Sequence, residues 1–379
     1  MESKIKVLTF IGTRPEIIRL SRTMALLDEH VNHIIVHTGQ NYDYELNEIF
    51  FREMELRKPD HFLNIDTSSL GTAVGEIIKK SEEVLRQEKP DAILVLGDTN
   101  SCLAAYIAKR MHIPVFHMEA GNRSYDFNVP EEINRRIIDH IADFNLVYTE
   151  HARRHLISEG LPHRRIYLTG SPMYEVLEHY LPKIRNSKAL EQLGIEKCRY
   201  FLVSAHREEN VDNQENLKKI ITILNELAIT YNFPVVVSTH PRTRKRLEQL
   251  DVEIHKNIQF LKPFGFIDYV FLQMNAACTL SDSGTISEES SILSFPAISL
   301  RQSMERPEAQ DTGSIILTGF DPITVLQSIK IEMDENGKGK QKSIPADYRI
   351  VNTSLRVVKL IIGNAGLSNL WHGIRKAKG

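Results

Sequence analysis

Three acidic side chains stand in short polar segments of this sequence. Asp98 lies in Gly97-Asp-Thr-Asn100, Glu119 in His117-Met-Glu-Ala-Gly121, and Glu131 in Val129-Pro-Glu-Glu-Ile-Asn-Arg135. Carboxylates that converge push one another's pKa values apart, so one side-chain type can supply both a general acid and a general base. Two simpler roles stay open, because Asp98 could cap a helix and Glu131 could pair with Arg135.

Arginines near the N-terminus are suited to holding an anion. Arg14 follows a Gly-Thr turn and precedes Pro15, which presets the first helical residue, so its guanidinium is expected to point out of the helix mouth. A planar fork of donors suits diphosphate oxygens. A salt bridge from Arg14 to Glu16 is the alternative. For Arg19, which is further along the same helix, the alternative is an ordinary surface position.

A second basic group comes from the other half of the chain. His206 and Arg207 lie in Ser204-Ala-His-Arg-Glu-Glu-Asn210, and His240 precedes Pro241-Arg242. The two segments follow predicted strands in matching positions, which indicates a cradle for a polyanion. A histidine taken alone is more often structural.

The segment Ser281-Asp-Ser-Gly284 interrupts an apolar run that continues as a helix. A strand, a turn of small residues and a helix N-terminus together favour phosphate binding. Ser283 and Gly284 allow the backbone to approach an anion closely. Glu288 and Glu289 lie too deep in the expected helix for the phosphate, but a carboxylate there can accept ribose hydroxyls. The alternative is a helix capped by Ser283, with acids in its first turns.

Short β-branched runs alternate with helical patterns, which predicts parallel sheets covered by helices. The predicted strands are residues 7–11, 33–37, 92–96, 115–118, 144–148 and 166–168, then 201–204, 235–238, 258–261, 277–280, 297–300 and 315–318. Helices are expected at 72–86, 100–111 and 353–362, and an exposed loop at 332–342. We therefore predict an α/β fold of two Rossmann-like, doubly wound domains facing across a cleft. Their expected bounds are 1–172 and 173–363, followed by a C-terminal tail, 364–379.

The polar segments all follow predicted strands, so we expect them to line that cleft. With 379 residues, the chain can bury two separate cores. The formal net charge of -2 gives no reason to expect a nucleic-acid or membrane partner. No Asp-x-Asp pair, HExxH motif or CxxC motif indicates a metal.

The three cysteines, Cys102, Cys198 and Cys278, are far apart and are interpreted as buried apolar residues. Such cysteine usage predicts a cytoplasmic protein. The apolar run near the N-terminus is too short for a signal peptide, and no run reaches the length of a membrane span.

Together these segments resemble the non-hydrolysing UDP-N-acetylglucosamine 2-epimerase family, from the N-terminus to about Ile362. The matching motifs occur in the family's order: Gly12-Thr-Arg-Pro-Glu16, Gly97-Asp-Thr99, His117-Met-Glu-Ala-Gly121, Pro130-Glu-Glu-Ile-Asn-Arg135, Ala205-His-Arg-Glu-Glu-Asn210, Ser281-Asp-Ser-Gly284 with Glu288-Glu289, and Glu305-Arg-Pro-Glu308. The resemblance implies the glycosyltransferase-B architecture, a homodimer, no cofactor, and a place in capsule or O-antigen polysaccharide biosynthesis.

For the chemistry, the resemblance implies that UDP is eliminated from a UDP-N-acetylated amino sugar, leaving a glycal, and is then added back. Asp98, Glu119 and Glu131 match the family's acid/base carboxylates, and His206 matches its histidine near the diphosphate. Arg14, Ser283 and Glu289 match its UDP contacts; Gly284, Arg207 and His240 are assigned to the same UDP site from their positions beside them.

Two departures from the family pattern bear on the substrate. Arg19 stands where the family usually has a lysine, and Gln40-Asn-Tyr-Asp-Tyr-Glu-Leu-Asn-Glu48 replaces a Gln-His-Arg-Glu-Met segment. Both resemble the branch that makes UDP-N-acetyl-L-fucosamine from UDP-2-acetamido-2,6-dideoxy-L-talose. Conversion of UDP-N-acetylglucosamine to UDP-N-acetylmannosamine is the alternative. A glycosyltransferase, a hydrolysing epimerase and a non-catalytic sensor of nucleotide sugars also stay open.

Overall fold

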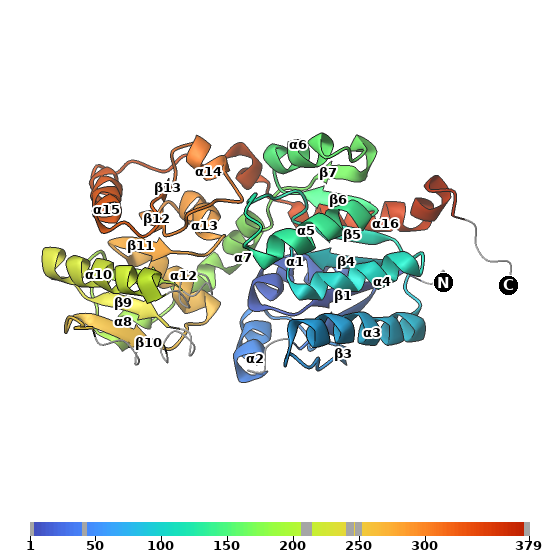
Figure 1. Cartoon of the computed structure of the whole chain (residues 1–379), viewed down its shortest axis with the longest axis horizontal. Helices are drawn as coiled ribbons and strands as arrows, with labels where there is room; N and C mark the ends of the chain where they lie inside the picture. Colours follow the sequence, from blue (N-terminus) through green and yellow to red (C-terminus); the bar gives the residue numbers. More distant parts are fainter. Residues whose placement is uncertain (1–3, 40–43, 206–213, 240–245, 247–251, 375–379) are drawn as a thin grey trace. The chain divides into compact units, whose positions relative to one another are not determined.

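The chain folds into two compact units, one formed by residues 1–178 with 346–379 and the other by residues 179–345 (Figure 1). The computed structural model describes residues 4–39, 44–205, 214–239, 246 and 252–374. Residues 1–178 with 346–379 form unit 1, and residues 179–345 form unit 2. Each unit is a parallel sheet covered by helices, as the sequence predicts.

Unit 1 is built on a seven-stranded parallel sheet with strand order β3-β2-β1-β4-β5-β6-β7. Its strands are β1 (Lys6–Ile11), β2 (Asn32–His37), β3 (His61–Phe62), β4 (Ala92–Leu96), β5 (Val115–Met118), β6 (Phe144–Val147) and β7 (Ile166–Leu168). The chain reverses direction across the sheet between β1 and β4, which is where ligands bind in open α/β sheets.

Helices cover both faces of this sheet. They are α1 (Arg14–His30), α2 (Tyr44–Glu53), α3 (Leu70–Glu88), α4 (Ala104–Arg110), α5 (Pro130–Ile141), α6 (Glu150–Ser158), α7 (Met173–Arg185), which runs on into unit 2, and α16 (Thr353–Trp371), with 3-10 turns at Asn100–Leu103, His163–Arg165 and Ala346–Arg349. α3, α4 and α5 follow one another side by side over alternate strand residues such as Leu8, Phe10 and Ile93, and α1 packs beside α16. The alternation follows from the two-residue period of a strand.

Unit 2 repeats this plan with a six-stranded parallel sheet of order β10-β9-β8-β11-β12-β13. Its elements are α8 (Ala189–Leu193), β8 (Phe201–Ser204), α10 (Gln214–Tyr231), β9 (Val235–Ser238), β10 (Ile258–Leu261), α12 (Phe266–Asn275), β11 (Cys278–Ser281), α13 (Ile286–Leu293), β12 (Ala297–Ser299), α14 (Glu308–Asp311), β13 (Ile316–Leu317) and α15 (Pro322–Gly337). Val203 and Val237 face the core beneath α10, whereas Leu202 and Val236 face the opposite core. Its reversal point lies between β8 and β11.

The domain bounds differ from the prediction at the C-terminal end. Residues 346–374 belong to unit 1, not to a second domain and a tail, and α16 continues to Trp371. Thr353 Oγ1 donates to the carbonyl oxygens of Thr169 and Ser171 at 3.1 Å each, and Ser354 N donates to Glu175 Oε2 at 2.9 Å. These hydrogen bonds hold the returning chain on unit 1. The first boundary also lies later, within α7.

Two local predictions were wrong as well. The segment 332–342 is not a loop throughout, because α15 extends to Gly337 and Glu332 is buried in an ion pair of 2.6 Å with Lys342. Cys198 is exposed, unlike Cys102 and Cys278, because it lies in a turn before β8 with φ of 57°. Among the helices of the described residues, none is long and apolar enough to cross a membrane.

Candidate functional site

The turn after β1 begins helix α1 and carries Arg14, one of the predicted site residues. Thr13 is the N-cap, Arg14 is the first helical residue, and Pro15 lies in the first turn, as the sequence predicts. The guanidinium carbon of Arg14 lies 5.7 Å from the ring centre of Phe50 on α2. A cation stacked on an aromatic ring at a helix N-terminus is held in position for an anion.

Glu16 ties this turn to the neighbouring turn after β4. Its Oε2 accepts from Gly12 N at 2.9 Å, Thr13 N at 2.7 Å and Thr13 Oγ1 at 2.8 Å, while Oε1 accepts from Thr99 Oγ1 at 3.1 Å and from Ser101 Oγ. Burial raises the pKa of the Glu16 carboxyl, and the hydrogen bonds from these donors oppose that rise. Glu16 is therefore a structural link between the Arg14 turn and the Asp98 turn.

Replacing Glu16 by alanine is expected to lower the free energy of unfolding by about 3 kcal/mol. The substitution leaves buried N–H and O–H donors of the two turns without an acceptor, and each such group costs about 1–3 kcal/mol. Urea denaturation measures the loss. Glu16→Gln keeps an acceptor and is expected to lose less than half as much. A loss below about 0.5 kcal/mol in Glu16→Ala, the lower bound for a single hydrogen bond, would contradict the link.

Asp98 is held at the end of β4 by side chains of α5. Arg135 Nη2 donates to Asp98 Oδ2, and Asn134 Nδ2 donates to the carbonyl oxygen of Asp98 at 2.9 Å. The 3-10 turn that follows has Thr99 at its N-cap, so the alternative role of Asp98 as a helix cap is wrong. The Asp98 side chain keeps 17% of its surface exposed. The Asp98 carboxylate is therefore fixed by α5 and accessible to solvent at the reversal point of the sheet.

Glu119 follows β5 and adopts a φ of 66°, in the left-handed region that residues with a side chain rarely enter. Arg19 Nη1 of α1 donates to Glu119 Oε2, and the Arg19 side chain is 12% exposed, so Arg19 is not a surface residue. A Cβ on Gly97 would lie 3.9 Å from the Glu119 carboxyl carbon. The Asp98 turn, Glu119 and Arg19 are therefore close together in unit 1.

Glu131 occupies the first turn of α5 and is exposed to solvent. Arg135, the partner in the alternative role of Glu131, donates to Glu132 Oε2 at 2.6 Å and to Asp98. The i,i+3 contact to Glu132 exists because both side chains lie on the buried face of α5.

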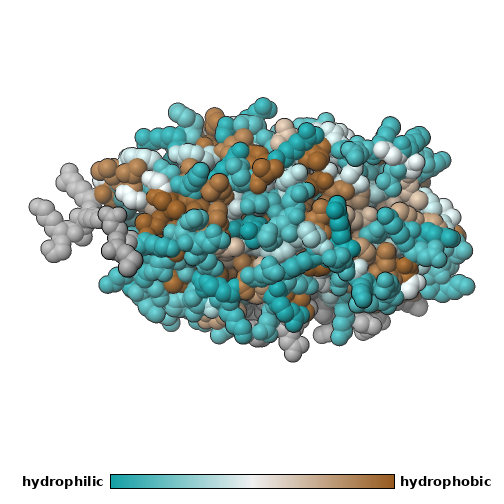
Figure 2. Space-filling model, turned by 180° about the vertical axis from the view of Figure 1, so that it is seen from behind, coloured by the Kyte–Doolittle hydropathy of each residue, from teal (hydrophilic) through white to brown (hydrophobic). Residues whose placement is uncertain are grey.

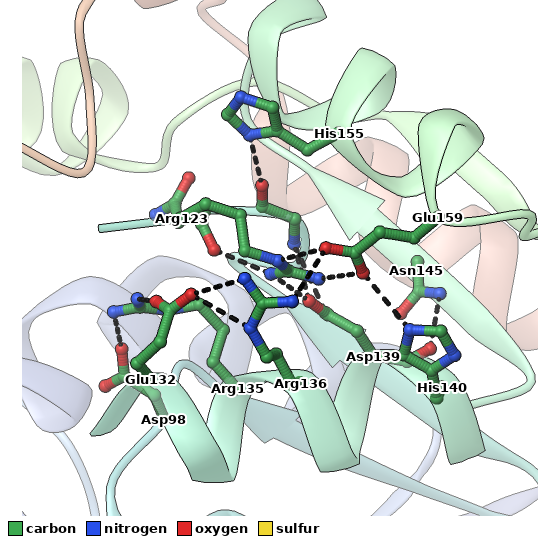
Figure 3. Close-up of polar contacts among 12 residues, drawn as sticks. Asp98, Arg123, Glu132, Arg135, Arg136, Asp139, His140, Asn145, His155 and Glu159 are labelled. Carbon is green, nitrogen blue, oxygen red and sulfur yellow. Dashed lines mark hydrogen bonds and ion pairs between the residues drawn. The ribbon is translucent and has the colours of Figure 1, made fainter. Parts of the chain in front are cut away.

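Behind Asp98 lies a network of buried charges, drawn in Figure 3. Arg123 donates to Asp139 Oδ2 at 2.7 Å and to both oxygens of Glu159 at 2.7 Å each, and Arg136 reaches Glu159 at 3.4 Å. The hydrogen bond from Arg123 lowers the pKa of Glu159 to about 2. Burial opposes the charge of Arg123, but its two carboxylate partners outweigh that effect and raise its pKa. The network joins the loop after β5 to α5 and α6.

The predicted phosphate turn of unit 2 has the expected strand, turn and helix order, with Ser283 and Gly284 between β11 and α13. The helix begins at Ile286 with Thr285 at the N-cap position, so Ser283 is not the cap. Glu288 and Glu289 consequently lie in the first helical turn, not deep in the helix. The small residues before the helix leave its N-terminus open to an anion.

The two acids of α13 differ in their surroundings. Glu288 is fully buried and accepts from Arg306 Nη1, whereas Glu289 is 8% exposed and accepts from Gln273 Nε2 at 2.7 Å. Glu288 is thus a structural residue, and Glu289 is the acid of α13 that keeps some access to solvent. A Cβ on Gly284 would lie 3.4 Å from Arg301 Nη1, so little room is left beside this turn.

His206, Arg207 and His240 lie outside the described residues, so the predicted polyanion cradle is not visible. Within the described ranges, no group of three or more His, Cys, Asp or Glu side chains could hold a metal ion. Sequence reasoning missed Glu16 as a link, although Thr-x-x-Glu is a known signature of a capping box. It also missed Arg123, Asp139 and Gln273, whose partners are distant in sequence and leave no local signal.

Comparison with known proteins identifies relatives over nearly the whole chain. A family model described as UDP-N-acetylglucosamine 2-epimerase matches residues 25–362. The structure of UDP-N-acetylglucosamine 2-epimerase from Rickettsia bellii is 48% identical and covers 97% of this chain and 100% of that chain, with a TM-score of 0.91. The Methanocaldococcus jannaschii UDP-GlcNAc 2-epimerase, solved with UDP-GlcNAc and UDP, is 34% identical, covers 95% and 100%, and has a TM-score of 0.87.

The name of a third relative gives a different sugar as its substrate. The UDP-2,3-diacetamido-2,3-dideoxy-D-glucuronate 2-epimerase of Pseudomonas aeruginosa is 32% identical over 358 residues, 91% of this chain and 99% of that protein. The two parallel, helix-covered sheets and the likeness to these solved structures define an α/β fold of the glycosyltransferase-B type. The chain belongs to the non-hydrolysing UDP-N-acetylglucosamine 2-epimerase family. Its members are isomerases, so the family and the fold class that the sequence predicts are confirmed.

Proposed function

We propose that this enzyme epimerises C2 of UDP-2-acetamido-2,6-dideoxy-L-talose to give UDP-N-acetyl-L-fucosamine. The contact between Arg19 and Glu119 carries the choice of substrate, because it places a guanidinium on a proposed acid/base carboxylate. Arginine offers a rigid fork of donors and lysine a single flexible ammonium, so the two residues present different surroundings to the sugar. The resemblance of Arg19 and of residues 40–48 to the deoxy-sugar branch supports the same substrate.

The reaction proceeds by elimination and addition. The C1–O bond breaks first and its electron pair leaves with UDP, because the C2 hydrogen beside an acetamido group is only weakly acidic. A carboxylate then takes the C2 proton, which gives the glycal. UDP oxygen returns to C1 while a second acid delivers a proton to the opposite face of C2. Asp98, Glu119 and Glu131 of unit 1 perform these proton transfers.

In this proposal Arg14, Ser283, Gly284 and Glu289 contact the nucleotide, and the N-terminus of α13 binds its phosphate. The proposal also assigns His206, Arg207 and His240 to the diphosphate, from their positions in the sequence. Stabilising the departing diphosphate lowers the barrier for the C1–O cleavage.

Product NMR on a panel of UDP-amino sugars in deuterated water tests the proposal. The L-talo compound is expected to give the L-fuco product with one deuterium at C2, without lasting release of UDP. Stoichiometric UDP release would indicate a hydrolysing enzyme, and transfer of the sugar to an acceptor without deuterium at C2 would indicate a glycosyltransferase. Absence of C2 deuterium with every sugar, together with tight UDP binding, would leave a sensor as the explanation.

A second candidate function is the conversion of UDP-N-acetylglucosamine to UDP-N-acetylmannosamine. The relative from M. jannaschii, which has 34% sequence identity, was solved with UDP-GlcNAc and UDP, and this supports the D-gluco substrate as well. The same NMR panel separates the two, because the preferred sugar is the one with the larger kcat/KM.

Arg14→Ala is expected to weaken UDP binding by about 1.5–3 kcal/mol, the usual contribution of a hydrogen bond to a charged group. Isothermal titration calorimetry with UDP measures the change in Kd. Arg22→Ala, on the same helix and outside the proposed site, serves as the control and is expected to bind UDP as wild type does. An unchanged Kd in Arg14→Ala would place Arg14 outside the nucleotide site.

We further infer that the enzyme is a homodimer through an apolar surface on α4 and α5. Tyr106, Ile133 and Ile137 are 40%, 51% and 42% exposed, and the two isoleucines lie one helical turn apart. Figure 2 shows that apolar patches also occur on the face drawn there, separated by hydrophilic side chains. The α4 and α5 surface is preferred because the two helices are neighbours and present their apolar residues together.

Light scattering is expected to give twice the mass of the chain for the wild type. Ile137→Glu places a charge in the proposed contact and is expected to give the mass of one chain. A single-chain mass for the wild type, or an unchanged dimer in Ile137→Glu, would contradict this surface.

A further inference from the structure

His117 is a fully buried histidine between two of the turns that carry the proposed acid/base residues. It lies on β5, and its Nε2 is 2.8 Å from the carbonyl oxygen of Gly97, the residue before Asp98. A carbonyl oxygen only accepts hydrogen bonds, so Nε2 carries the proton and donates it. The His117 ring therefore fixes the backbone of the Asp98 turn through the Gly97 carbonyl.

The opposite edge of the ring faces Asp139, which holds the second turn. His117 Nδ1 lies 3.0 Å from Asp139 Oδ1, the distance of an ion pair with an imidazolium that carries a proton on both nitrogens, and both Asp139 oxygens accept from Gly121 N at 3.2 Å. Gly121 comes two residues after Glu119. Asp139 is itself fixed by Arg123, as Figure 3 shows. A continuous line of contacts thus runs from the Gly97 carbonyl through His117 and Asp139 to the Glu119 turn.

The Glu119 turn in particular needs such support because its backbone is unusual. Glu119 has a φ of 66° although it carries a side chain, whereas Gly97 and Gly121, with φ values of 70° and 83°, adopt this region without strain. A Cβ on Gly121 would lie 2.4 Å from the carbonyl oxygen of Ala152, so this turn is also closely packed. A left-handed residue other than glycine persists only where surrounding contacts hold it.

We propose that His117, acting through Asp139 and the Gly97 carbonyl, is a positioning residue that sets the relative placement of Asp98 and Glu119. This inference rests on the proposed role of those two carboxylates in proton transfer at C2. His117 itself does not touch the substrate in this scheme. Its contribution is to keep both carboxylates within the narrow geometry that proton transfer requires.

Replacing His117 by a shorter and by a longer amide side chain separates a positioning role from a general structural role. His117→Asn is too short for the Gly97 carbonyl and is expected to lower kcat by about 100-fold, the usual cost of a displacement of about 1 Å at a reacting centre. His117→Gln can place an amide N–H near the position of Nε2 and is expected to recover at least tenfold of that loss. KM and the Kd for UDP are expected to stay within about twofold in both variants, because neither depends on proton transfer.

His33 provides a matched control in the same unit. It is also a buried histidine with two partners, Thr9 Oγ1 at 2.8 Å and Asp28 Oδ1 at 2.7 Å, but it lies near the start of β2, at the other edge of the sheet. His33→Asn is expected to lower Tm and leave kcat unchanged. A kcat in His117→Asn equal to wild type, or no difference between His117→Asn and His117→Gln, would overturn the proposal.

A crystal structure of His117→Asn decides the inference independently of turnover. The carboxyl carbons of Asp98 and Glu119 are expected to move apart or together by about 1 Å relative to the wild-type crystal structure. If wild type exchanges no C2 deuterium, the proposed function fails while this geometric comparison still decides the role of His117. Unmoved carboxyl groups in the variant would refute the positioning role even if the enzyme is an active epimerase.

Discussion

Asp98→Asn is expected to lower kcat by about 10³-fold while leaving the Kd for UDP unchanged. General acid–base catalysis by one positioned group contributes about 10²–10⁴-fold, and the amide can neither take nor return a proton. Its size is close to that of the carboxyl, and Arg135 keeps Glu132 as a partner, so the fold is retained. Glu131→Gln is likewise expected to lower kcat and to leave the Kd for UDP unchanged. Solvent deuterium uptake at C2 measures turnover, and calorimetry measures UDP affinity.

Asp66→Asn is the matched control for this prediction. Asp66 is exposed and its carboxylate accepts from Ser68 N at 2.8 Å, in the loop between β3 and α3, which carries none of the proposed site residues. Its substitution is expected to change neither kcat nor Kd. Turnover in Asp98→Asn within threefold of wild type, a margin of about 0.7 kcal/mol in the barrier, would remove Asp98 from the mechanism.

Arg123→Met is expected to lower the free energy of unfolding by about 3–5 kcal/mol, the usual cost of removing one partner from a buried ion pair. The Arg123 side chain is fully buried, and methionine fills much of its volume without a charge. Asp139 of α5 is also fully buried, and it would lose its ion pair with Arg123 of the loop after β5. Denaturant unfolding followed by circular dichroism measures the change.

Arg136→Met is the control, because Arg136 contacts the same Glu159 at 3.4 Å but is 30% exposed. Exposed pairs contribute about 0–1 kcal/mol, so the control is expected to lose at most that amount. Equal losses in the two variants would contradict the importance of the buried pair. Arg136 also donates to the buried Glu132 at 3.1 Å, but Glu132 keeps Arg135 as a partner, so the control leaves no buried carboxylate without a cation.

The ion pair of Arg123 and Glu159 makes the folded protein less stable as the pH falls. The pKa of Glu159 is lowered from 4.5 to about 2 by Arg123, so the folded protein keeps this carboxyl ionised where the unfolded chain protonates it. The stabilisation is complete above about pH 4.5 and is lost as the pH falls from there towards 2. Arg123→Met is expected to flatten this part of the stability profile.

Most of the fold could be predicted because it follows local patterns. The apolar runs from Val7 to Ile11 and from Phe201 to Ser204 are short, β-branched or aromatic, and bounded by turn residues, and the structure has strands there. Every predicted strand is present with ends within one residue. β3 was missed because its two residues, His61 and Phe62, are too few to form a pattern.

The interactions that hold the candidate site could not be predicted in the same way. Arg19 meets Glu119 across 100 residues of sequence, and Arg135 meets Asp98 across 37. Such contacts depend on which strands are neighbours in the sheet, and a single sequence does not show this. The strand ends themselves were predictable, so Asp98 and Glu119 could be placed at one edge of the sheet while their partners could not be named.

The return of the C-terminal segment to unit 1 has a consequence for how the protein is made. Unit 2 is one continuous stretch of the chain, whereas unit 1 needs α16, which follows unit 2, to cover α1. During translation, unit 2 can therefore complete its structure while the earlier-synthesised unit still waits for α16. A ribosome that stalls between unit 2 and α16 would hold a chain whose first-made half is the unfinished one.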